Sequence, residues 1–276
     1  MLPVTGAGYD FARPFSMPII QHHSSRTTMK TPPFLYKYQS FTQYSLQSLS
    51  ENTVWMSSPA SFNDPFDCAI NLDPKRLHES VAHALEIVTK NAVVDDALKA
   101  PSELDEAAYA ELRESLRAHM QKIGVLCLSE TPEEILMWSH YAEYHKGFCI
   151  EFMIDDMCLL GRLAQPVKYT EIYPSLSLKD LPADAEESFI DVCVYTKAKQ
   201  WSYEREWRAL ALTGDKLYRA PAPISAIIFG ARMPDAHKTE IHQILHLNPG
   251  IQFKEAFMLE DVFGLGFRPY LASSAS

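Results

Sequence analysis

The feature that most restricts the fold of this chain is a set of short apolar runs in which side chains alternate as they do in β-strands. They lie at 34–38, 53–57, 124–129, 224–229 and 251–258, and turn residues or segments with helical spacing separate them. Strands that cluster in this way, with helices placed irregularly between them, are typical of α+β folds rather than of a strict strand–helix alternation. We therefore predict an α+β fold with a mixed or antiparallel sheet and flanking helices.

The chain divides by composition into a lead-in, one domain and an insertion. Residues 1–33 mix Pro, Ser, Thr, Gly and His without a regular period, so we expect a loose N-terminal segment. Residues 34–270 are expected to form a single domain. A helical insertion interrupts it over about 75–122, where Ala, Leu, Glu and Lys dominate and apolar residues recur every three or four positions.

Charge and cysteine content restrict the compartment and the partners. The formal net charge is −10, so the chain as a whole repels polyphosphates and non-specific nucleic-acid binding is disfavoured. The 5 Cys form no C-x-x-C pair and lie mostly inside apolar runs, which indicates buried thiols in a reducing compartment. No apolar stretch approaches the roughly 18 residues of a membrane span, and no signal peptide is recognisable. We predict a cytoplasmic protein without a membrane partner.

Two helices in the second half of the chain are predicted from local signals. Thr131 fits an N-cap, Pro132 fits the first helical position, and a Glu follows three positions after the cap. This helix is expected to run to about His145, with Gly147 as its stop. A second helix is expected over 188–199, where apolar residues form one stripe.

The segment 201–208, WSYEREWR, carries the most informative charges. If 204–212 is a strand, Glu204, Glu206 and Arg208 share one face, because side chains alternate across a strand. Two adjacent carboxylates raise the pKa of one of them or require a cation between them, as acid/base sites often do. The alternative is ordinary ion pairing, of Glu206 with Arg208 and of Glu204 with a neighbouring Lys.

Three further segments carry candidate binding residues. The predicted helix around Trp138, His140 and Tyr141 interleaves aromatic and polar side chains, as a helix that lines a pocket for a planar ligand would. A core helix with satisfied polar tips is the alternative. The other candidates are Asn63 and Asp64 in a turn before a Pro, and Tyr36 and Lys37 on the first predicted strand.

Motifs of several enzyme classes are absent from the sequence. It contains no G-x-G-x-x-G, no G-x-x-x-x-G-K-[ST], no G-x-S-x-G and no H-E-x-x-H. His140 and His145 are five residues apart, so they face different sides of the predicted helix. We expect no dedicated metal site.

Five motifs, LYKY, SFNDPFD, MWSHYA, KGFCIEF and EREWR, resemble in this order a widespread bacterial family whose domain has no assigned function. The order of elements is also similar to that of ADP-ribosyltransferases, in which a first strand carries a polar residue, a middle strand a hydroxyl and a late strand an E-x-E. The matching positions are Tyr36 or Lys37, Ser129, and Glu204 with Glu206. The chain departs from the arginine-type pattern, because it lacks a first-strand Arg and a Ser-Thr-Ser triplet.

The second similarity implies a transferase that uses NAD as co-substrate to modify a protein or nucleic acid, as a bacterial toxin or defence factor would. Cleavage of the nicotinamide–ribose bond develops oxocarbenium character. The resemblance assigns its stabilisation to Glu206 and assistance of the nucleophile to Glu204. It implies NAD-binding roles for Tyr36, Lys37, Asn63, Asp64, Ser129, Trp138, His140 and Tyr141.

Two other hypotheses stay open. One is a non-catalytic module that binds a ligand or partner through the aromatic helix around Trp138. The other is a metal-dependent nuclease or hydrolase that uses Asp64, His140, Glu204 and Glu206, with a divalent ion bridging the carboxylates.

Overall fold

The computed structural model describes three main stretches of the chain. The described residues are 31–69, 71–72, 107, 110–111, 114, 117–118, 120–176 and 192–271. Nearly all of the expected lead-in (1–33) and most of the expected helical insertion (75–122) lie outside them. These two expectations, and the single domain predicted over 34–270, stay predictions.

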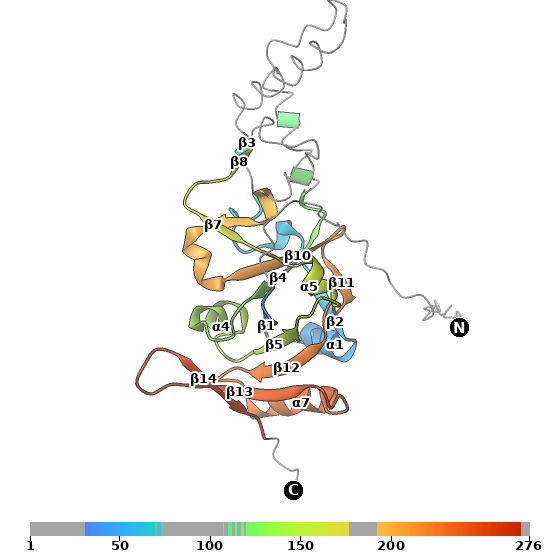
Figure 1. Ribbon diagram of the computed structural model, residues 1–276, viewed down its shortest axis with the longest axis vertical. Coiled ribbons are helices and arrows are strands. Elements are labelled where there is room, and N and C mark those ends of the chain that lie inside the picture. Colours follow the sequence, from blue (N-terminus) through green and yellow to red (C-terminus); the bar gives the residue numbers. More distant parts are fainter. Residues whose placement is uncertain are drawn as a thin grey trace, which may run out of the picture.

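The described part is an α+β fold around one eight-stranded mixed sheet, which confirms the predicted fold class. The strands of this sheet are β1 Phe34–Gln39, β4 Gly124–Ser129, β5 Phe148–Met153, β6 Gln165–Pro166, β10 Glu206–Ala211, β12 Ile224–Phe229, β13 Gln252–Met258 and β14 Leu265–Pro269. They are ordered β14, β13, β12, β5, β1, β4, β10, β6, and all of them except β6 are labelled in Figure 1. Neighbours are antiparallel except for the parallel pair β12 and β13.

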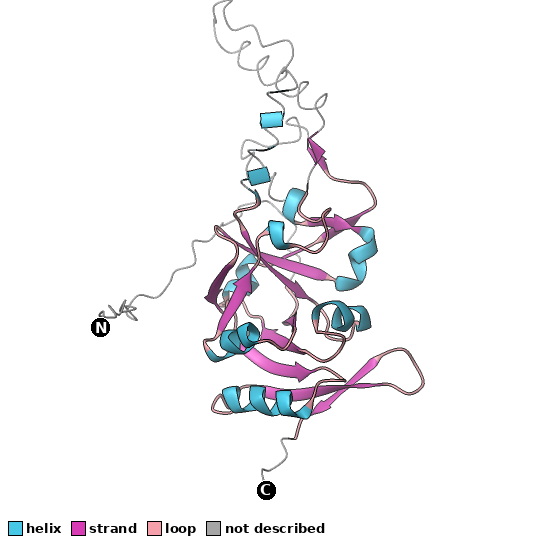
Figure 2. Cartoon of the chain, turned by 180° about the vertical axis from the view of Figure 1, so that it is seen from behind, coloured by secondary structure: helices cyan, strands magenta, loops and turns pink. Residues whose placement is uncertain are grey.

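Helices and short strand pairs surround this sheet. The helices are α1 Gln43–Ser50, α4 Ile135–Tyr141, α5 Leu159–Leu163 and α7 Asp235–Leu245, and the 3-10 helices are η1 Pro59–Ser61 and η4 Lys199–Glu204. The short pairs join β2 Thr53–Met56 to β11 Lys216–Arg219, β3 Asn71–Leu72 to β8 Ser175–Leu176, and β7 Lys168–Thr170 to β9 Thr196–Ala198. Seen from behind in Figure 2, α7 lies along β13. This helix is the crossover that lets β12 and β13 run parallel.

The two faces of the central strand β5 are both covered. Phe148 and Phe152 pack into the larger core together with Leu49 of α1. Cys149 points to the opposite face, where it packs with Trp138 of α4 and Tyr38 of β1. Both faces of β5 are buried because helices cover both sides of the sheet at its centre.

The start of α4 differs from the sequence prediction. The helix begins at Ile135, and the carboxylate of Glu134 caps it by accepting the backbone N–H of Leu136 at 3.2 Å. The predicted cap, Thr131, instead accepts the backbone N–H of Glu133 at 3.1 Å in the preceding turn. Thr is a preferred N-cap residue and Glu is not, so the local signal favoured Thr131 over the cap that the structure uses.

The end of α4, at Tyr141, also comes earlier than predicted. Glu143, Tyr144 and His145 take left-handed backbone angles, with φ of 50°, 56° and 68°. The left-handed conformation disfavours L residues by roughly 1–2 kcal/mol each, and a right-handed helix cannot continue through it. Backbone hydrogen bonds hold the turn, including one from the N–H of His145 to the carbonyl of Trp138 at 3.1 Å.

Gly147 was predicted to end the helix, but the structure places it where the chain packs closely against β1. A Cβ atom at this position would overlap the backbone carbonyl oxygen of Gln39 on β1. We expect Gly147→Ala to lower the free energy of unfolding by about 1–3 kcal/mol, because the backbone must shift to relieve the overlap. Gly250→Ala is the matched control, since no atom lies within 4 Å of the added Cβ. Urea denaturation midpoints that coincide for both variants would contradict this account.

Two observations concern the predictions of buried thiols and of no membrane partner. All five cysteines are free; Cys68, Cys149 and Cys193 are buried, and Cys127 and Cys158 are half-buried. Within the described ranges, no helix has the length and apolar character needed to cross a membrane.

Candidate functional site

The main sheet is split between β1 and β4. Strand β1 pairs with β5 along its whole length, and β4 does so with β10. The two halves are joined at one register position, where Tyr36 lies opposite Ser129. Beside this joint, the Nζ atom of Lys37 reaches across and donates to the carbonyl oxygen of Cys127 at 3.2 Å. The divergence of the two strands opens the sheet on one side of the joint.

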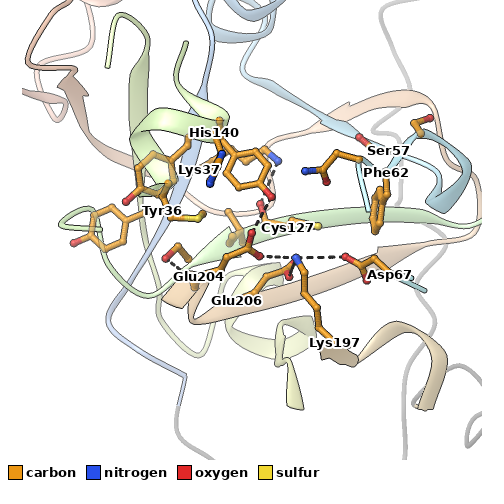
Figure 3. Close-up of a pocket in the computed structure, with 17 residues that line it drawn as sticks. Tyr36, Lys37, Ser57, Phe62, Asp67, Cys127, His140, Lys197, Glu204 and Glu206 are labelled. Carbon is orange, nitrogen blue, oxygen red and sulfur yellow. Dashed lines mark hydrogen bonds and ion pairs between the residues drawn. The ribbon is translucent and has the colours of Figure 1, made fainter. Parts of the chain in front are cut away.

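A cavity of about 350 Å³ lies at this split (Figure 3). Side chains from β1, β4, α4, β9, η4 and β10 line it, together with the segment that follows β2. Elements from both halves of the sheet therefore contribute to one hollow. Its volume falls in the range of roughly 300–1,000 Å³ that is usual for small-molecule sites.

Most of the predicted site residues meet around this cavity. Those that line it are Tyr36, Lys37, Asn63, Ser129, His140, Tyr141, Glu204 and Glu206. They come from segments that are far apart in the sequence, so the fold brings them together.

Two predicted site residues lie elsewhere. Trp138 has no exposed surface, and its indole N–H donates to the carbonyl of Pro132 at 2.7 Å, so it is a core residue. Asp64 does not line the cavity; it accepts the backbone N–H of Phe66 at 2.9 Å and the indole N–H of Trp201 at 2.6 Å. Asp64 therefore fixes the loop, as expected of an Asp in a turn.

Glu204 and Glu206 converge by a different backbone path from the predicted strand. Glu204 ends η4, Arg205 has a left-handed φ of 44°, and β10 begins only at Glu206. The predicted single strand over 204–212 is thus wrong at its start. The hydroxyl of Ser129 holds this bend by donating to the carbonyl of Glu204 at 2.7 Å.

A cation between the two carboxylates is supplied by Lys197 of β9. Its Nζ atom donates to Glu204 Oε2 at 2.5 Å and to Glu206 Oε2 at 2.9 Å. Asp67 Oδ2 lies 3.4 Å from the same nitrogen, and Figure 3 shows these carboxylates pointing at it. Lys197 falls in the predicted helix over 188–199, which is wrong here because residues 196–198 form β9.

Arg208 completes this group, which we call the charge cluster and define as Asp67, Lys197, Glu204, Glu206 and Arg208. The fully buried guanidinium binds Glu206 through Nε at 2.7 Å and Nη2 at 2.9 Å, and Asp67 through Nη1 at 2.9 Å and Nη2 at 2.7 Å. The cluster holds three carboxylates against two cations. Buried charges are tolerated only when paired in this way, and the cluster retains one excess negative charge when all its groups are ionised.

The environment separates the two glutamates electrostatically. Burial raises the pKa of Glu204 above its ordinary value, and nearby Glu206 adds to this, against the lowering effect of Lys197. Burial also acts to raise the pKa of Glu206, but the charges of Arg208 and Lys197 outweigh it and hold that pKa well below its ordinary range. When the pKa values of two neighbouring carboxyl groups are separated in this way, one group can take up and release a proton while the other stays negatively charged.

Lys197 is not placed to act as a nucleophile. Burial acts to lower its pKa, but Glu206, Asp67 and Glu204 outweigh burial and raise the pKa above the ordinary lysine value. The ammonium therefore stays protonated, and it serves as a counter-ion.

Sequence reasoning did not identify Asp67. It expected ordinary ion pairs of Glu206 with Arg208 and of Glu204 with a neighbouring Lys, and the structure contains both pairs, with Lys197 as that Lys. It did not expect these pairs to be buried. Arg208 is instead fully buried, with its guanidinium carbon 5.5 Å from the centre of the Phe62 ring. One signal was available, since charged residues within apolar runs such as VCVYTKA need buried partners of opposite charge.

Aromatic rings border the cavity on the side of α4 and η4. His140 lines it, and the ring centres of Trp201 and Tyr203 lie 6.3 and 6.4 Å from the His140 ring. Trp201 and Tyr203 are 6.0 Å apart. The exposed His140 ring and the half-buried rings of Trp201 and Tyr203 offer apolar area to a ligand next to the charge cluster.

Comparison with known proteins adds one finding. Residues 137–209 match a family model described as "Protein of unknown function (DUF2971)". This part of the chain is similar to that uncharacterised family. The DUF2971 match runs from α4 to β10 and contains Tyr141, Lys197 and both glutamates, while the LYKY and SFNDPFD motifs lie outside it. No curated protein and no solved structure matches the chain.

The described residues give little support to the two alternatives. Among them, no group of three or more His, Cys, Asp or Glu side chains could hold a metal ion. Lys197 already fills the point at which the carboxylates meet. Trp138, the residue expected to form a binding surface, lies inside the core, so its replacement by Ala would destabilise the fold by about 3–5 kcal/mol and would not report on binding.

Proposed function

We propose that this protein transfers the ADP-ribosyl group of NAD to an acceptor in the cavity at the split of the sheet. The observation that carries the proposal is a single row of residues across three strands. Tyr36 on β1 pairs with Ser129 on β4, and Ser129 pairs with Glu206 on β10. Directly paired residues project on the same face of a sheet. These are the polar, hydroxyl and acidic positions in which the sequence resembles ADP-ribosyltransferases.

The lining of the cavity suits the reacting end of NAD. Tyr36, His140 and Tyr141 supply aromatic rings that can pack against nicotinamide. Lys37, which follows Tyr36 on β1, supplies a positive charge. The charge cluster forms the floor. Its excess negative charge, held in a water-poor site, favours the positive charge that develops on the ribose as the bond to nicotinamide breaks.

The geometry changes the role expected of Glu206 but not that of Glu204. Both oxygens of Glu206 are bound by cations, so Glu206 acts as a fixed part of the cluster. Glu204 keeps the role of assisting the nucleophile, since its raised pKa makes it the carboxylate that most readily takes up a proton.

Nicotinamide release from NAD, with water as acceptor, tests this function without knowledge of the natural target. Asn63 is exposed and lines the cavity, so Asn63→Trp is expected to fill the hollow and abolish release. Asn248→Trp places the same side chain at an exposed site after α7 and is expected to leave release unchanged. Release that is absent from the wild type, or equal in both variants, would refute the proposal.

The pH dependence of the reaction is expected to show the raised pKa of Glu204. Only the ionised carboxylate accepts a proton, so the turnover number should fall as the pH drops through that pKa. The midpoint should therefore lie above 4.5, the ordinary value for Glu. Circular dichroism at each pH separates this loss from unfolding. An acidic limb with its midpoint at or below 4.5 would contradict the assignment.

A further inference from the structure

The carboxylate proposed to accept a proton is covered by another side chain. Glu204 is only 3% exposed, and its Oε2 atom is bound to Lys197. Its other oxygen, Oε1, accepts the hydroxyl of Tyr141 at 2.8 Å. The Tyr141 hydroxyl therefore occupies the carboxylate oxygen that Lys197 leaves unbound, and it belongs to the more exposed of the two side chains.

Tyr141 has the chemistry and the position of an intermediate proton carrier. Both residues line the cavity, but Tyr141 is half-buried whereas Glu204 is buried. Burial and the charge of Glu204 raise the pKa of Tyr141, while hydrogen bonding to the Asn63 side chain acts in the opposite direction. A phenol with a raised pKa stays neutral, and a neutral hydroxyl can donate one hydrogen bond while accepting others.

We propose that Tyr141 is a catalytic residue that relays the proton of the acceptor to Glu204. The inference rests on the proposed function and specifies the path of its proton. The nucleophilic atom of the acceptor bonds to C1′ of the ribose as the bond from C1′ to nicotinamide breaks, and nicotinamide leaves with the electron pair. The proton of the nucleophile passes to Tyr141 Oη. The original hydroxyl proton of Tyr141 passes to Glu204 Oε1, so Glu204 ends neutral and Tyr141 is restored.

The ion pair with Lys197 also fits the relay, because it determines which oxygen of Glu204 is left to accept the proton. Lys197 holds Oε2 in place and leaves Oε1 as the oxygen that faces Tyr141. Ser129 fixes the backbone carbonyl of the same residue. Glu204 is thus constrained at three points, and one oxygen points along the line to the cavity. Proton transfer along a preformed hydrogen bond needs this kind of fixed geometry.

The test compares wild type, Tyr141→Phe and Tyr144→Phe in nicotinamide release from NAD, with water as acceptor. Tyr144 is 69% exposed on the turn after α4, so Tyr144→Phe is the matched control and should behave as wild type. Tyr141→Phe keeps the ring but removes the relay, so kcat should fall by about 100-fold or more while KM for NAD stays within a few-fold.

Nicotinamide release in mixtures of H₂O and D₂O reports the number of protons that move in the rate-limiting step. Wild-type kcat plotted against the deuterium fraction should bow below the straight line between the H₂O and D₂O values, as two moving protons require, and the plot should become linear in Tyr141→Phe.

The outcomes separate the relay from the function on which it rests. If wild type releases nicotinamide and Tyr141→Phe retains its kcat and its isotope dependence, the relay is overturned while the transferase proposal stands. A loss in Tyr141→Phe with an unchanged, curved isotope dependence also overturns the relay, because it shows a merely structural role. If wild type releases no nicotinamide, both proposals fail.

Discussion

Replacement of Arg208 by Met is expected to lower the free energy of unfolding by about 3–5 kcal/mol, because removal of one partner leaves buried charge uncompensated. Arg208 has no exposed surface and binds both Glu206 and Asp67 through paired hydrogen bonds. Without the guanidinium, the buried cluster would hold three carboxylates against one ammonium. Denaturant unfolding monitored by tryptophan fluorescence measures the loss.

Two comparisons show whether charge is the cause of that loss. Arg219→Met removes an exposed arginine and should change the free energy of unfolding by no more than about 0.5 kcal/mol. Adding Glu206→Gln to Arg208→Met should recover part of the stability, because it removes one of the uncompensated charges. The account of the cluster is wrong if the two arginine variants unfold alike, or if the second substitution makes the loss larger.

Glu204→Gln is expected to reduce nicotinamide release by about 10²–10⁴-fold, the usual contribution of a positioned acid/base group. The amide keeps the shape of the side chain but cannot accept the proton. Glu240→Gln changes an exposed glutamate on α7 and is the matched control, with activity expected to equal that of wild type. Stability measured for each variant excludes unfolding as the cause.

Glu206→Gln distinguishes the two glutamates. Because Glu206 is bound by Arg208 and Lys197, its neutralisation should lower both stability and activity, whereas Glu204→Gln should lower activity with little loss of stability. The same pattern in both variants would contradict the separate roles assigned to them. Full activity in Glu204→Gln would remove the residue from the reaction.

The elements that local pattern predicted well are those whose burial follows from a short segment. Strands β4 and β12 have the bounds expected from their apolar runs and flanking turns. Strand β14, Leu265–Pro269, was missed, because it contains Gly and Pro and becomes a strand only by pairing with β13. Its place at the sheet edge depends on that tertiary contact, which local propensity does not contain.

Most residues of the candidate site were predicted from the sequence, but the backbone path that brings them together was not. Glu204 and Glu206 were expected on one face of a continuous strand, with the pKa of one of them raised or a cation between them. Arg205 adopts a left-handed angle that only Gly, Asn and Asp adopt readily, so no sequence rule indicates it. The bend is held at Glu204, where Ser129, distant in sequence, binds the backbone carbonyl and the nearby Lys197 binds the carboxylate.

The most direct measurement is calorimetric titration of NAD into the folded protein, which needs neither an acceptor nor turnover. The account predicts saturable binding by wild type, retained binding by Glu204→Gln, and loss of binding in Asn63→Trp but not in Asn248→Trp. Heats no larger than dilution for wild type, or equal binding by Asn63→Trp, would contradict the claim that the cavity at the split of the sheet is an NAD site.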